Sequence, residues 1–307
     1  MKFEKIMIAG LGALGLTYAE YFSKVPGVTV CGLVDKERKE RYERDGRIWN
    51  GERRDYPYIT PDMTDVKADL VLVATKSSGL EAAIKEIPNV LKDDTVIMSV
   101  MNGISSEPML AEAFGADRVI GAVYLGHPGQ NVNGQVSHDG SFKTYIGELE
   151  GATRSERITA LEELFNKAGM NVNVPDSIQY KLWAKFMMLV AFNQPTVLYD
   201  TDWTPYTQYE GGMDLSEHLM EEVCAVAAAA GVEGADEMVK ENREFVKRSP
   251  LETNPPIHQD FTEGRRMEAD ILSGEVVRRG KEYGLDTPYN QAVYDVLNIL
   301  NQKNAKR

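Results

Sequence analysis

A glycine pattern close to the N-terminus constrains the fold more than any other feature of the sequence. The apolar run 5–9 leads directly into Gly10-Leu11-Gly12-Ala13-Leu14-Gly15, and a helical pattern over residues 16–22 follows. A G-x-G-x-x-G sequence between a buried strand and a helix is typical of dinucleotide-binding βαβ units. Its first glycine permits a tight turn, its second lets backbone approach a pyrophosphate, and its third lets helix and strand pack closely. We therefore predict that residues 10–15 bind a dinucleotide at the start of the helix. The alternative is a glycine-rich turn that has lost its ligand.

An acidic residue after the next predicted strand bears on the choice of cofactor. Asp35 lies 20 residues after Gly15, where a carboxylate would accept hydrogen bonds from the adenosine ribose and repel a 2′-phosphate. Lys36 and Arg38 follow directly, and either side chain could bind a 2′-phosphate if Asp35 turned away. Both NADH and NADPH therefore stay open, and Asp35 favours NADH.

Up to about residue 150, short apolar runs alternate with helical patterns. Strands are predicted over 5–9, 28–34, 70–74, 96–100 and 119–123. Helices are predicted after Gly12, after Asp35, over 79–91 and over 106–114. This alternation indicates βαβ units, and the nearly continuous apolar content of the strands suits a parallel sheet covered on both faces. Two further pieces, 135–138 and 144–148, flank a turn at Asp139-Gly140 and predict a hairpin at the sheet edge.

Beyond about residue 152 the strand signals stop and helical periodicity takes over. One apolar stripe, ended by Gly231, is formed by Leu215, Leu219, Val223, Val226 and Ala230. Further helices are predicted over 155–168, 177–199, 235–247, 258–283 and 289–302. The turn Val174-Pro175-Asp176 is the predicted domain boundary, because proline disfavours helix at the residue before it. The predicted fold class is α/β, with a Rossmann-type doubly wound parallel sheet over 1–174 and an all-helical C-terminal domain over 175–307.

The composition excludes several classes of function. The chain of 307 residues has 47 acidic and 34 basic side chains and a net charge of −13, which gives no footprint for nucleic acid. No apolar run approaches the roughly 20 residues that cross a bilayer, and no signal-peptide pattern opens the chain, so we expect a cytoplasmic protein. The two cysteines, Cys31 and Cys224, are too few for a disulfide framework and are expected in the core. No metal site is expected, because no metal-ligand spacing relates the four histidines, His127, His138, His218 and His258.

Several short motifs carry a resemblance to a known family. The strand at 70–74 ends in Thr75-Lys76-Ser77, and the strand at 96–100 ends in Met101-Asn102-Gly103. Ligands in open α/β sheets lie beyond the carboxyl ends of the strands, so Lys76 and Asn102 should converge with the glycine loop. The later motifs are Leu182-Trp183-Ala184-Lys185-Phe186 with Asn193, then Glu268-Ala269-Asp270, Ser273-Gly274 and Pro288-Tyr289-Asn290. In this order they resemble the ketopantoate reductase (2-dehydropantoate 2-reductase) family over nearly the whole chain.

The resemblance implies an activity and a set of roles. It implies reduction of a 2-keto acid to a 2-hydroxy acid with NAD(P)H, by family default NADPH, between two domains that close on the substrate. In this family the substrate is 2-dehydropantoate, reduced to pantoate in pantothenate biosynthesis. Lys185 matches the catalytic proton donor and Glu268 the acid that hydrogen-bonds the substrate hydroxyl. Asn102 matches a residue beside nicotinamide and substrate, Asn193 a substrate residue, and Lys76 the lysine on the cofactor side.

The residues themselves support two of these roles in part. Lys185 interrupts the apolar run 182–192, and burial would lower its pKa, as suits a general acid near neutrality. The alternative is a lysine that extends to solvent from a partly buried helix or pairs with a carboxylate. Lys181, one turn earlier, is expected to face solvent. For Glu268 the alternative is a solvated helix face with charge pairs such as Arg266 with Asp270.

Two positions depart from the family pattern and leave the substrate open. Leu189 stands where the family commonly has a substrate-binding asparagine, and Thr253-Asn254-Pro255-Pro256 stands where it has a Ser-Ser pair. Proline supplies neither a hydroxyl nor an N–H, so we expect Thr253 or Asn254 to contact the substrate instead. The alternatives are a reductase for another 2-keto or 3-keto acid, or a dinucleotide-sensing regulator without turnover. A homodimer assembled through the helical domain also stays open.

Overall fold

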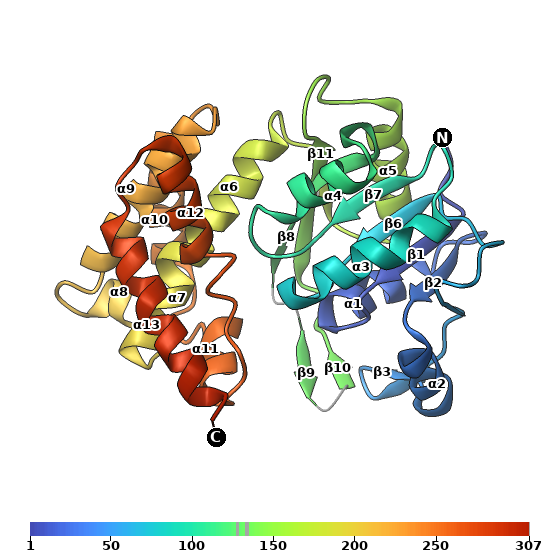
Figure 1. Ribbon diagram of the computed structural model, residues 1–307, viewed down its shortest axis with the longest axis horizontal. Coiled ribbons are helices and arrows are strands. Elements are labelled where there is room, and N and C mark those ends of the chain that lie inside the picture. Colours follow the sequence, from blue (N-terminus) through green and yellow to red (C-terminus); the bar gives the residue numbers. More distant parts are fainter. Residues whose placement is uncertain (127–128, 133–134, 307) are drawn as a thin grey trace. The chain divides into compact units, whose positions relative to one another are not determined.

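The structure, a computed structural model, describes residues 1–126, 129–132 and 135–306 and divides them into two compact units (Figure 1). The first unit comprises Met1–Met101 and Ser106–Ile178, and the second comprises Asn102–Ser105 and the residues from Gln179 on. This division follows Ile178, whereas the predicted boundary follows Val174. The reason is that Ile178 packs into space left by two glycines of the first unit. A Cβ added at Gly121 or Gly147 would lie 2.8 or 2.9 Å from Ile178 side-chain atoms.

An eight-stranded sheet forms the centre of the first unit. Its order is β12-β11-β8-β7-β6-β1-β2-β5, and all neighbouring pairs are parallel except β11 with β8. The strands are β1 (Lys5–Ala9), β2 (Thr29–Leu33), β5 (Tyr58–Ile59), β6 (Leu70–Val73), β7 (Val96–Ser99), β8 (Val119–Gly126), β11 (Phe142–Glu148) and β12 (Val172–Asn173). The five predicted apolar strands are confirmed.

Helices cover both faces of this sheet. The helical elements of the first unit are α1 (Ala13–Phe22), α2 (Lys36–Asp45), η1 (Ser77–Gly79), α3 (Leu80–Glu86), η2 (Ile87–Val90), α4 (Ser106–Phe114), η3 (Ala116–Arg118) and α5 (Glu156–Lys167). Ile6 and Ile8 of β1 pack with α1 and α5, while the alternate residues Met7 and Ala9 pack with α3 and α4. Both faces are therefore buried, which explains why the strands are apolar throughout. The predicted Rossmann-type sheet is confirmed.

The predicted hairpin at the sheet edge is wrong. Residues 135–137 form β10 (Gln135–Ser137), which pairs with β9 (Gln130–Val132) and β3 (Arg47–Trp49) in a separate sheet of order β4-β3-β10-β9. The strand β4 spans Glu52–Arg54, and β11 pairs with β8 instead. Two hydrogen bonds between Asn50 and the His138 backbone, of 2.8 and 3.1 Å, hold β10 beside β3. The prediction failed because the partner strand is short and distant in sequence. The strand β12 is a second exception, since no strand was predicted beyond residue 152.

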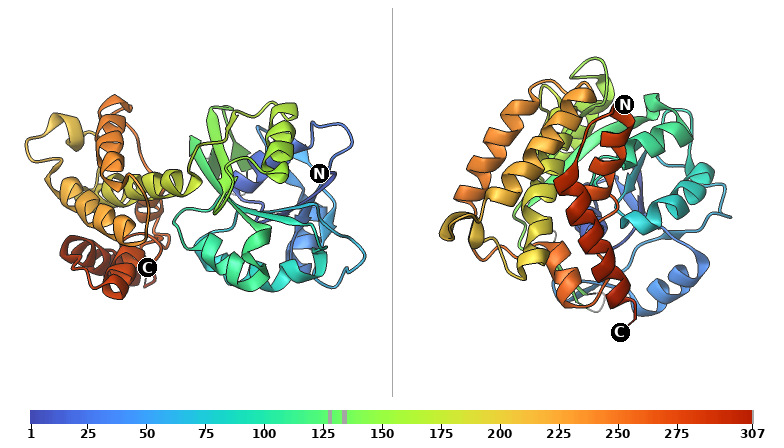
Figure 2. Two further views of the ribbon diagram at one scale, coloured as in Figure 1. Left: turned by 90° about the horizontal axis from the view of Figure 1, so that it is seen from above. Right: turned by 60° about the vertical axis from the view of Figure 1, so that its left-hand side comes forward.

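The second unit is helical, as predicted. It contains α6 (Ile178–Met188), the π-helix η4 (Leu189–Asn193), α7 (Gln194–Tyr199), α8 (Pro205–Gln208), α9 (Asp214–Ala229), α10 (Ala235–Arg248), α11 (Pro256–Thr262), α12 (Ser273–Tyr283) and α13 (Pro288–Asn304). Figure 2 shows these helices, coloured from yellow to red, from two further sides. The predicted stripe on α9 is buried at Leu219, Val223 and Val226, while Leu215 and Ala230 at its ends are not. Gly231, with φ +81, follows the helix end.

Two predicted helices are interrupted. The helix predicted over 177–199 contains the π-helix, and the helix predicted over 258–283 is wrong between Thr262 and Ser273. Gly264 has φ +68 there, and the Arg265 N–H donates to the Asp260 carbonyl at 2.7 Å. The Asn301 side chain then bonds the N–H and the carbonyl of Met267 at 2.8 and 3.1 Å. These side-chain partners replace helical hydrogen bonds, so the segment 263–272 is not helical.

A buried polar network joins α7, α12, α13 and α9. Gln194 exchanges hydrogen bonds of 2.6 and 3.2 Å with Ser273, and Ser273 donates to Asn290 at 2.9 Å. The Glu222 carboxylate accepts from the N–H groups of Tyr289 and Asn290, both at 2.8 Å, and from the Asn290 amide at 2.7 Å. Ser273 and Asn290, two of the motif residues above, therefore hold the helices together, and Glu222 caps the start of α13.

Replacement of Glu222 should destabilise the second unit. Glu222→Ala leaves buried N–H groups at the start of α13 without their charged acceptor, which should lower the free energy of unfolding by about 3 kcal/mol. The measurement is urea unfolding followed by circular dichroism. Glu221→Ala is the matched control, because Glu221 is exposed on the same helix. Equal unfolding midpoints for the two variants would contradict this role.

Candidate active site

The glycine loop has the geometry that a dinucleotide requires. Gly10 has φ +99, and a Cβ there would lie 2.8 Å from the Ala74 carbonyl group at the end of β6. A Cβ at Gly15 would lie 1.9 Å from the Gly10 oxygen, so α1 packs directly against the loop. At Gly12 nothing lies within 4 Å of an added Cβ. The outer glycines therefore serve packing, and the middle one leaves open space where a pyrophosphate fits.

The start of α1 offers hydrogen-bond donors to this space. Gly12 is the N-cap residue, with no side-chain cap and no acidic residue in the first turn. The helical hydrogen bonds begin with Leu16 N–H to Gly12 carbonyl at 2.9 Å. The N–H groups of Ala13, Leu14 and Gly15 thus precede the first helical acceptor and suit an anion.

Asp35 has a structural role in the first unit. It is the N-cap of α2, where its Oδ1 accepts from the Arg38 N–H at 2.7 Å. The Arg38 guanidinium lies 3.3 Å from the other carboxylate oxygen. The Asp35 side chain keeps 45% of its surface exposed, so its remaining lone pairs can accept hydrogen bonds from a ribose.

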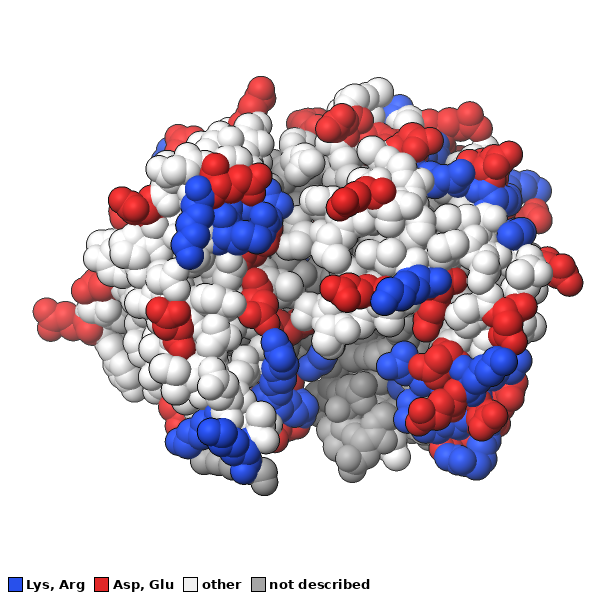
Figure 3. All heavy atoms as spheres, in the orientation of Figure 1, with Lys and Arg blue, Asp and Glu red and all other residues white. Residues whose placement is uncertain are grey.

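Acidic groups surround the basic residues that follow Asp35. The Lys36 ammonium pairs with Asp62 at 3.1 Å, and hydrogen bonds from Thr60 and Lys36 lower the pKa of Asp62 to about 2. Burial raises the pKa of Glu86, and the charge of nearby Asp35 raises it further. Lys36 and Arg38 are each paired with a carboxylate, so a 2′-phosphate would have to compete with these carboxylates for either cation. In the view of Figure 3, acidic and basic side chains are likewise intermixed on the surface.

The strands β6 and β7, after which Lys76 and Asn102 follow, end side by side. Val73 pairs with Ser99, and the Thr75 hydroxyl lies 3.6 Å from the Met101 sulfur. Lys76 is exposed at the start of η1, directly beyond β6. Asn102 is exposed and begins the segment that belongs to the second unit, where a Cβ at Gly103 would lie 3.2 Å from the Ile271 carbonyl.

The predicted site residues are thus divided between the two units. The first unit contains the loop 10–15, Asp35, Lys36 and Lys76, and the second contains Asn102, Lys185, Asn193, Thr253, Asn254 and Glu268. Lys185 is half-buried on α6, between the buried residues Trp183 and Phe186. Lys181, predicted to face solvent, is half-buried and pairs with Glu241 at 3.5 Å.

Side chains stabilise the π-helix η4, which begins four residues after Lys185 and ends at Asn193. Four successive carbonyls, of residues 190 to 193, accept hydrogen bonds of 2.6 to 3.2 Å. Their donors are Gln194, Ser216, Tyr206 and Thr196, respectively. A widened turn shifts the residues beyond it around the helix axis, and such turns are frequent at functional sites. The side-chain donors therefore fix the direction in which Asn193 points.

Asn193 shows a structural sign of a ligand contact in the second unit. It is 6% exposed, and its Oδ1 has no hydrogen-bond partner within the described residues. A buried amide oxygen without a partner costs about 1–3 kcal/mol. A bound molecule that donates a hydrogen bond to this oxygen would remove the cost.

Glu268 lies in an irregular segment that neighbouring side chains hold in place. Met267 and Ala269 on either side are fully buried, while Glu268 itself is half-buried. Asn301 fixes Met267, as described above, and Asp270 accepts from Tyr294 at 2.9 Å. Arg266 and Asp270 form the expected ion pair, at 2.8 Å. The alternative explanation of Glu268, a solvated helix face, fails because this segment is not helical.

Thr253 and Asn254 make local contacts. The Thr253 hydroxyl donates to the Pro250 carbonyl at 2.5 Å, and the Asn254 Oδ1 lies 2.9 Å from His258 Nδ1. His258 is buried and its Nε2 lies 3.2 Å from Asp200. Sequence spacing did not indicate these contacts of His258, because one partner, Asn254, is four residues away and the other, Asp200, follows the distant helix α7. Pro256 occupies the first turn of α11, a position that favours proline.

Other classes of site find no support in the part of the chain that the structure describes. No cluster of three metal-ligating side chains occurs there, and His127 lies outside the described residues. None of the helices found there has the length and apolarity that crossing a bilayer requires. Cys31 is buried, as predicted, while Cys224 is only half-buried on α9.

The Rossmann-type unit with its open glycine loop at the start of α1 has the features of a dinucleotide-binding domain, and a helical unit follows it. Two family models match the chain. The model described as "Ketopantoate reductase PanE/ApbA" matches residues 6–151, and the one described as "Ketopantoate reductase PanE/ApbA C terminal" matches residues 177–301. The chain therefore belongs to the ketopantoate reductase PanE/ApbA family. This membership makes the protein an NAD(P)-dependent oxidoreductase that acts on CH–OH groups, and it favours an enzyme over a regulator without turnover.

Relatives and solved structures agree over almost the full length. The 2-dehydropantoate 2-reductase of Archaeoglobus fulgidus is 26% identical over 97% of this chain and 98% of its own. The oxidoreductase YkpB of Bacillus subtilis is 24% identical over 94% and 96%. A D-mandelate dehydrogenase solved with NADH and anilino(oxo)acetate has a TM-score of 0.86 at 21% identity, over 98% and 99% of the chains. A dimeric ketopantoate reductase from Staphylococcus aureus has a TM-score of 0.79 at 21% identity, over the same shares. These structures share the fold.

A methyl group at Gly12 should block the cofactor without disturbing the fold. Gly12→Ala has room for its Cβ, but that methyl enters the space of the pyrophosphate and should raise the Kd for NADH about tenfold or more. Fluorescence titration measures the Kd, and the melting temperature should stay near that of the parent. Gly15→Ala is the contrasting variant, expected to lower the melting temperature because its Cβ would overlap the Gly10 oxygen. Tight NADH binding by Gly12→Ala would contradict the assignment.

Proposed function

We propose that the protein reduces a 2-keto acid to the 2-hydroxy acid, with NADH as the preferred cofactor. The observation that carries the proposal is the open space at Gly12 beside the uncapped start of α1, in a chain of this family. When bound, the reduced nicotinamide supplies a hydride to the keto carbon. Residues 10–15 would hold the pyrophosphate, Asp35 the adenosine ribose, and Lys76 the cofactor on the side of β6.

The charges around the adenosine ribose position favour NADH. Asp35, Asp62 and Glu86 gather around Lys36 and Arg38. A 2′-phosphate would displace the carboxylate partners of both basic residues and would itself be repelled by Asp35. A ribose hydroxyl, in contrast, can donate to the exposed part of the Asp35 carboxylate. The arrangement therefore supports NADH, against the family default of NADPH.

The second unit supplies the polar groups for the substrate. Lys185, half-buried on α6, donates a proton to the oxygen of the carbonyl that is reduced. Glu268, whose segment Asn301 and Tyr294 hold in place, accepts a hydrogen bond from the new hydroxyl. Asn102 and Asn193 hold the substrate, and the unpartnered Oδ1 of Asn193 supports its role. Thr253 and Asn254 are the remaining candidates for substrate contacts.

Two substrates are candidates. Family membership and the relatives named as 2-dehydropantoate 2-reductases support 2-dehydropantoate, and with it a step towards pantothenate. Leu189 favours a second candidate, a 2-keto acid with an apolar side chain. Leu189 is 7% exposed and lies between Lys185 and Asn193 along one continuous helical stretch, where it cannot hydrogen-bond the terminal hydroxyl of 2-dehydropantoate. The structurally similar D-mandelate dehydrogenase, which was solved with an aromatic oxoacetate, supports this candidate too.

Removal of the Lys185 amine tests the proton-donor role. Lys185→Ala should lower kcat about 100-fold or more, because general acid catalysis contributes roughly 10²–10⁴-fold. The Kd for NADH should change little, since the cofactor loop belongs to the other unit. Steady-state kinetics and NADH titration measure the two quantities. Lys181→Ala, one turn earlier on the same helix, is the matched control and should keep its kcat. Lys185→Ala with parental kcat would remove this residue from the mechanism.

Replacement of Asp35 tests the cofactor preference. Asp35→Ser removes the charge while a serine still caps α2, so the fold should be kept. The ratio of kcat/KM for NADPH to that for NADH should rise roughly tenfold or more, because the repulsion of a 2′-phosphate is lost. Asp45→Asn, at the far end of α2, is the control and should leave the ratio unchanged. An unchanged ratio in Asp35→Ser would contradict the account of NADH preference.

A further inference from the structure

Arg47 of β3 is a buried cation in contact with the glycine loop. Its residue surface is 9% exposed, and one guanidinium nitrogen donates to the Leu11 carbonyl at 2.9 Å. Leu11 lies between Gly10 and Gly12, so this bond reaches the loop itself. On its other side, the guanidinium carbon lies 4.7 Å from the centre of the Tyr42 ring. The arginine is therefore fixed against the loop.

No acidic side chain among residues 1–126, 129–132 and 135–306 neutralises the charge of Arg47. Within the described residues Arg47 takes part in no ion pair, and its buried Nε has no hydrogen-bond partner. Arg54 is paired with Arg47 across β3 and β4 and shows the opposite arrangement. Its guanidinium contacts Glu20 at 2.8 Å and Glu52 at 2.7 Å. Because an unpaired buried charge is costly, the burial of Arg47 without an acid calls for an anion from outside the chain.

Close packing around Leu11 holds the Arg47 guanidinium next to the glycine loop. A Cβ at Gly32 of β2 would lie 2.7 Å from a Leu11 methyl carbon and 2.9 Å from the Tyr58 ring. The Tyr58 and Tyr42 rings lie 5.6 Å apart. Leu11, the two tyrosines and Arg47 thus form one packed group at the end of β2. The basic residues Lys36 and Arg38 on α2 are neutralised, as shown above, and Arg47 is not.

We propose that Arg47 is a phosphate-recognition residue of the dinucleotide site, and that its fixed positive charge stabilises the bound pyrophosphate. The pyrophosphate is favoured over a 2′-phosphate, because Arg47 bonds the glycine loop whereas the ribose is assigned to Asp35. The inference rests on the proposed binding of a dinucleotide and does not depend on which keto acid is reduced. It applies to NADH and NADPH alike.

The test compares ligands with and without phosphates. Arg47→Met keeps the length of the apolar stem and removes the charge. It should raise the Kd for ADP and NADH about tenfold and leave the Kd for adenosine within twofold, as measured by calorimetry or competition. The dependence of ADP binding on salt should become weaker. Arg47→Lys should recover a substantial part of the ADP affinity, because it restores the charge.

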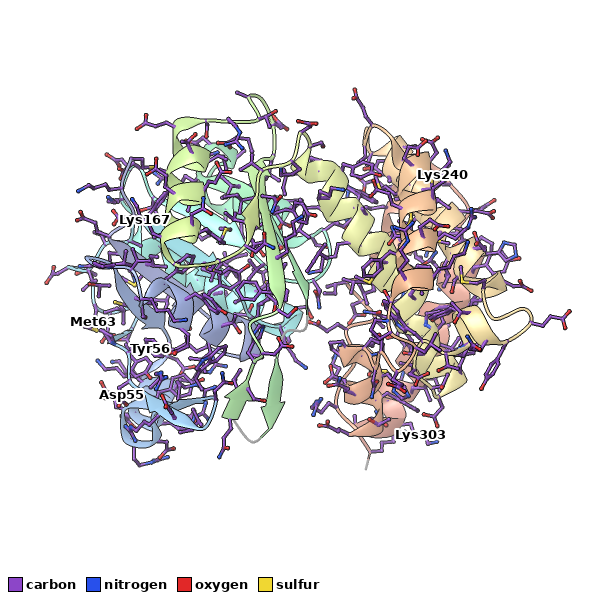
Figure 4. The ribbon with its side chains drawn as sticks, turned by 180° about the vertical axis from the view of Figure 1, so that it is seen from behind. Asp55, Tyr56, Met63, Lys167, Lys240 and Lys303 are labelled. Atoms are coloured by element: carbon purple, nitrogen blue, oxygen red, sulfur yellow. The ribbon has the colours of Figure 1, made fainter. Side chains whose placement is uncertain are left out.

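Arg54→Met is the matched control. It removes a neutralised guanidinium from the same small sheet, next to Asp55 and Tyr56, which are labelled in Figure 4. Its ADP affinity should stay parental, and the melting temperature of each variant shows whether it is folded. Parental ADP affinity in Arg47→Met would overturn the proposal, and so would an equal loss for ADP and adenosine, because the arginine would then only shape the loop.

The proposal can be separated from the proposed reduction. If Arg47→Met does not fold, the Arg47→Lys variant provides the test. Tight ADP binding with parental salt dependence would support phosphate recognition by the charge. An equal loss of affinity for ADP and adenosine would overturn the proposal. A parent protein that binds ADP but reduces no keto acid would contradict the proposed reduction and leave this test intact. A parent that fails to bind ADP or NADH would overturn both.

Discussion

The close packing of α1 against the glycine loop is the constraint on which the cofactor site depends. A side chain at Gly15 would overlap the Gly10 oxygen, so the helix can begin at Ala13 only if this position lacks a Cβ. That start leaves the first N–H groups without a side-chain cap and Gly12 open to a phosphate. It also presents the Leu11 carbonyl to Arg47. The close packing at Gly15 therefore determines where the proposed pyrophosphate site begins.

The central sheet was predictable because its signals are local. Strands such as β1 and β6 are apolar at every position, since both faces of the sheet are covered, and β1 leads directly into the glycine motif. The failures depend on partners far away in the sequence. The strand β10 pairs with β3, which is only three residues long and lies far from it in the sequence. The segment 263–272 follows a helical pattern, yet Asn301 of α13 takes the hydrogen bonds of Met267.

The candidate site was predictable to the extent that motifs mark it. The resemblance picked out Lys185, Asn193 and Glu268, and the structure shows which side chains hold the segments of Asn193 and Glu268. The π-helix that orients Asn193 has no sequence signature of its own, because Ser216 and Tyr206 reach its carbonyls from other helices. Arg47 belongs to no motif, and only its burial without an acid marks it. Asp35 was found by spacing, but its role as the cap of α2 required the structure.

The central claim is that the protein is an NADH-preferring reductase of 2-keto acids. The most direct measurement follows the absorbance of reduced nicotinamide with the purified protein. It uses NADH and NADPH in separate reactions, with 2-dehydropantoate and phenylglyoxylate as an aromatic 2-keto acid. The account predicts steady oxidation with one of these acids and a higher kcat/KM with NADH. Tight binding of NADH with no oxidation by either acid, or a clear preference for NADPH, would contradict it.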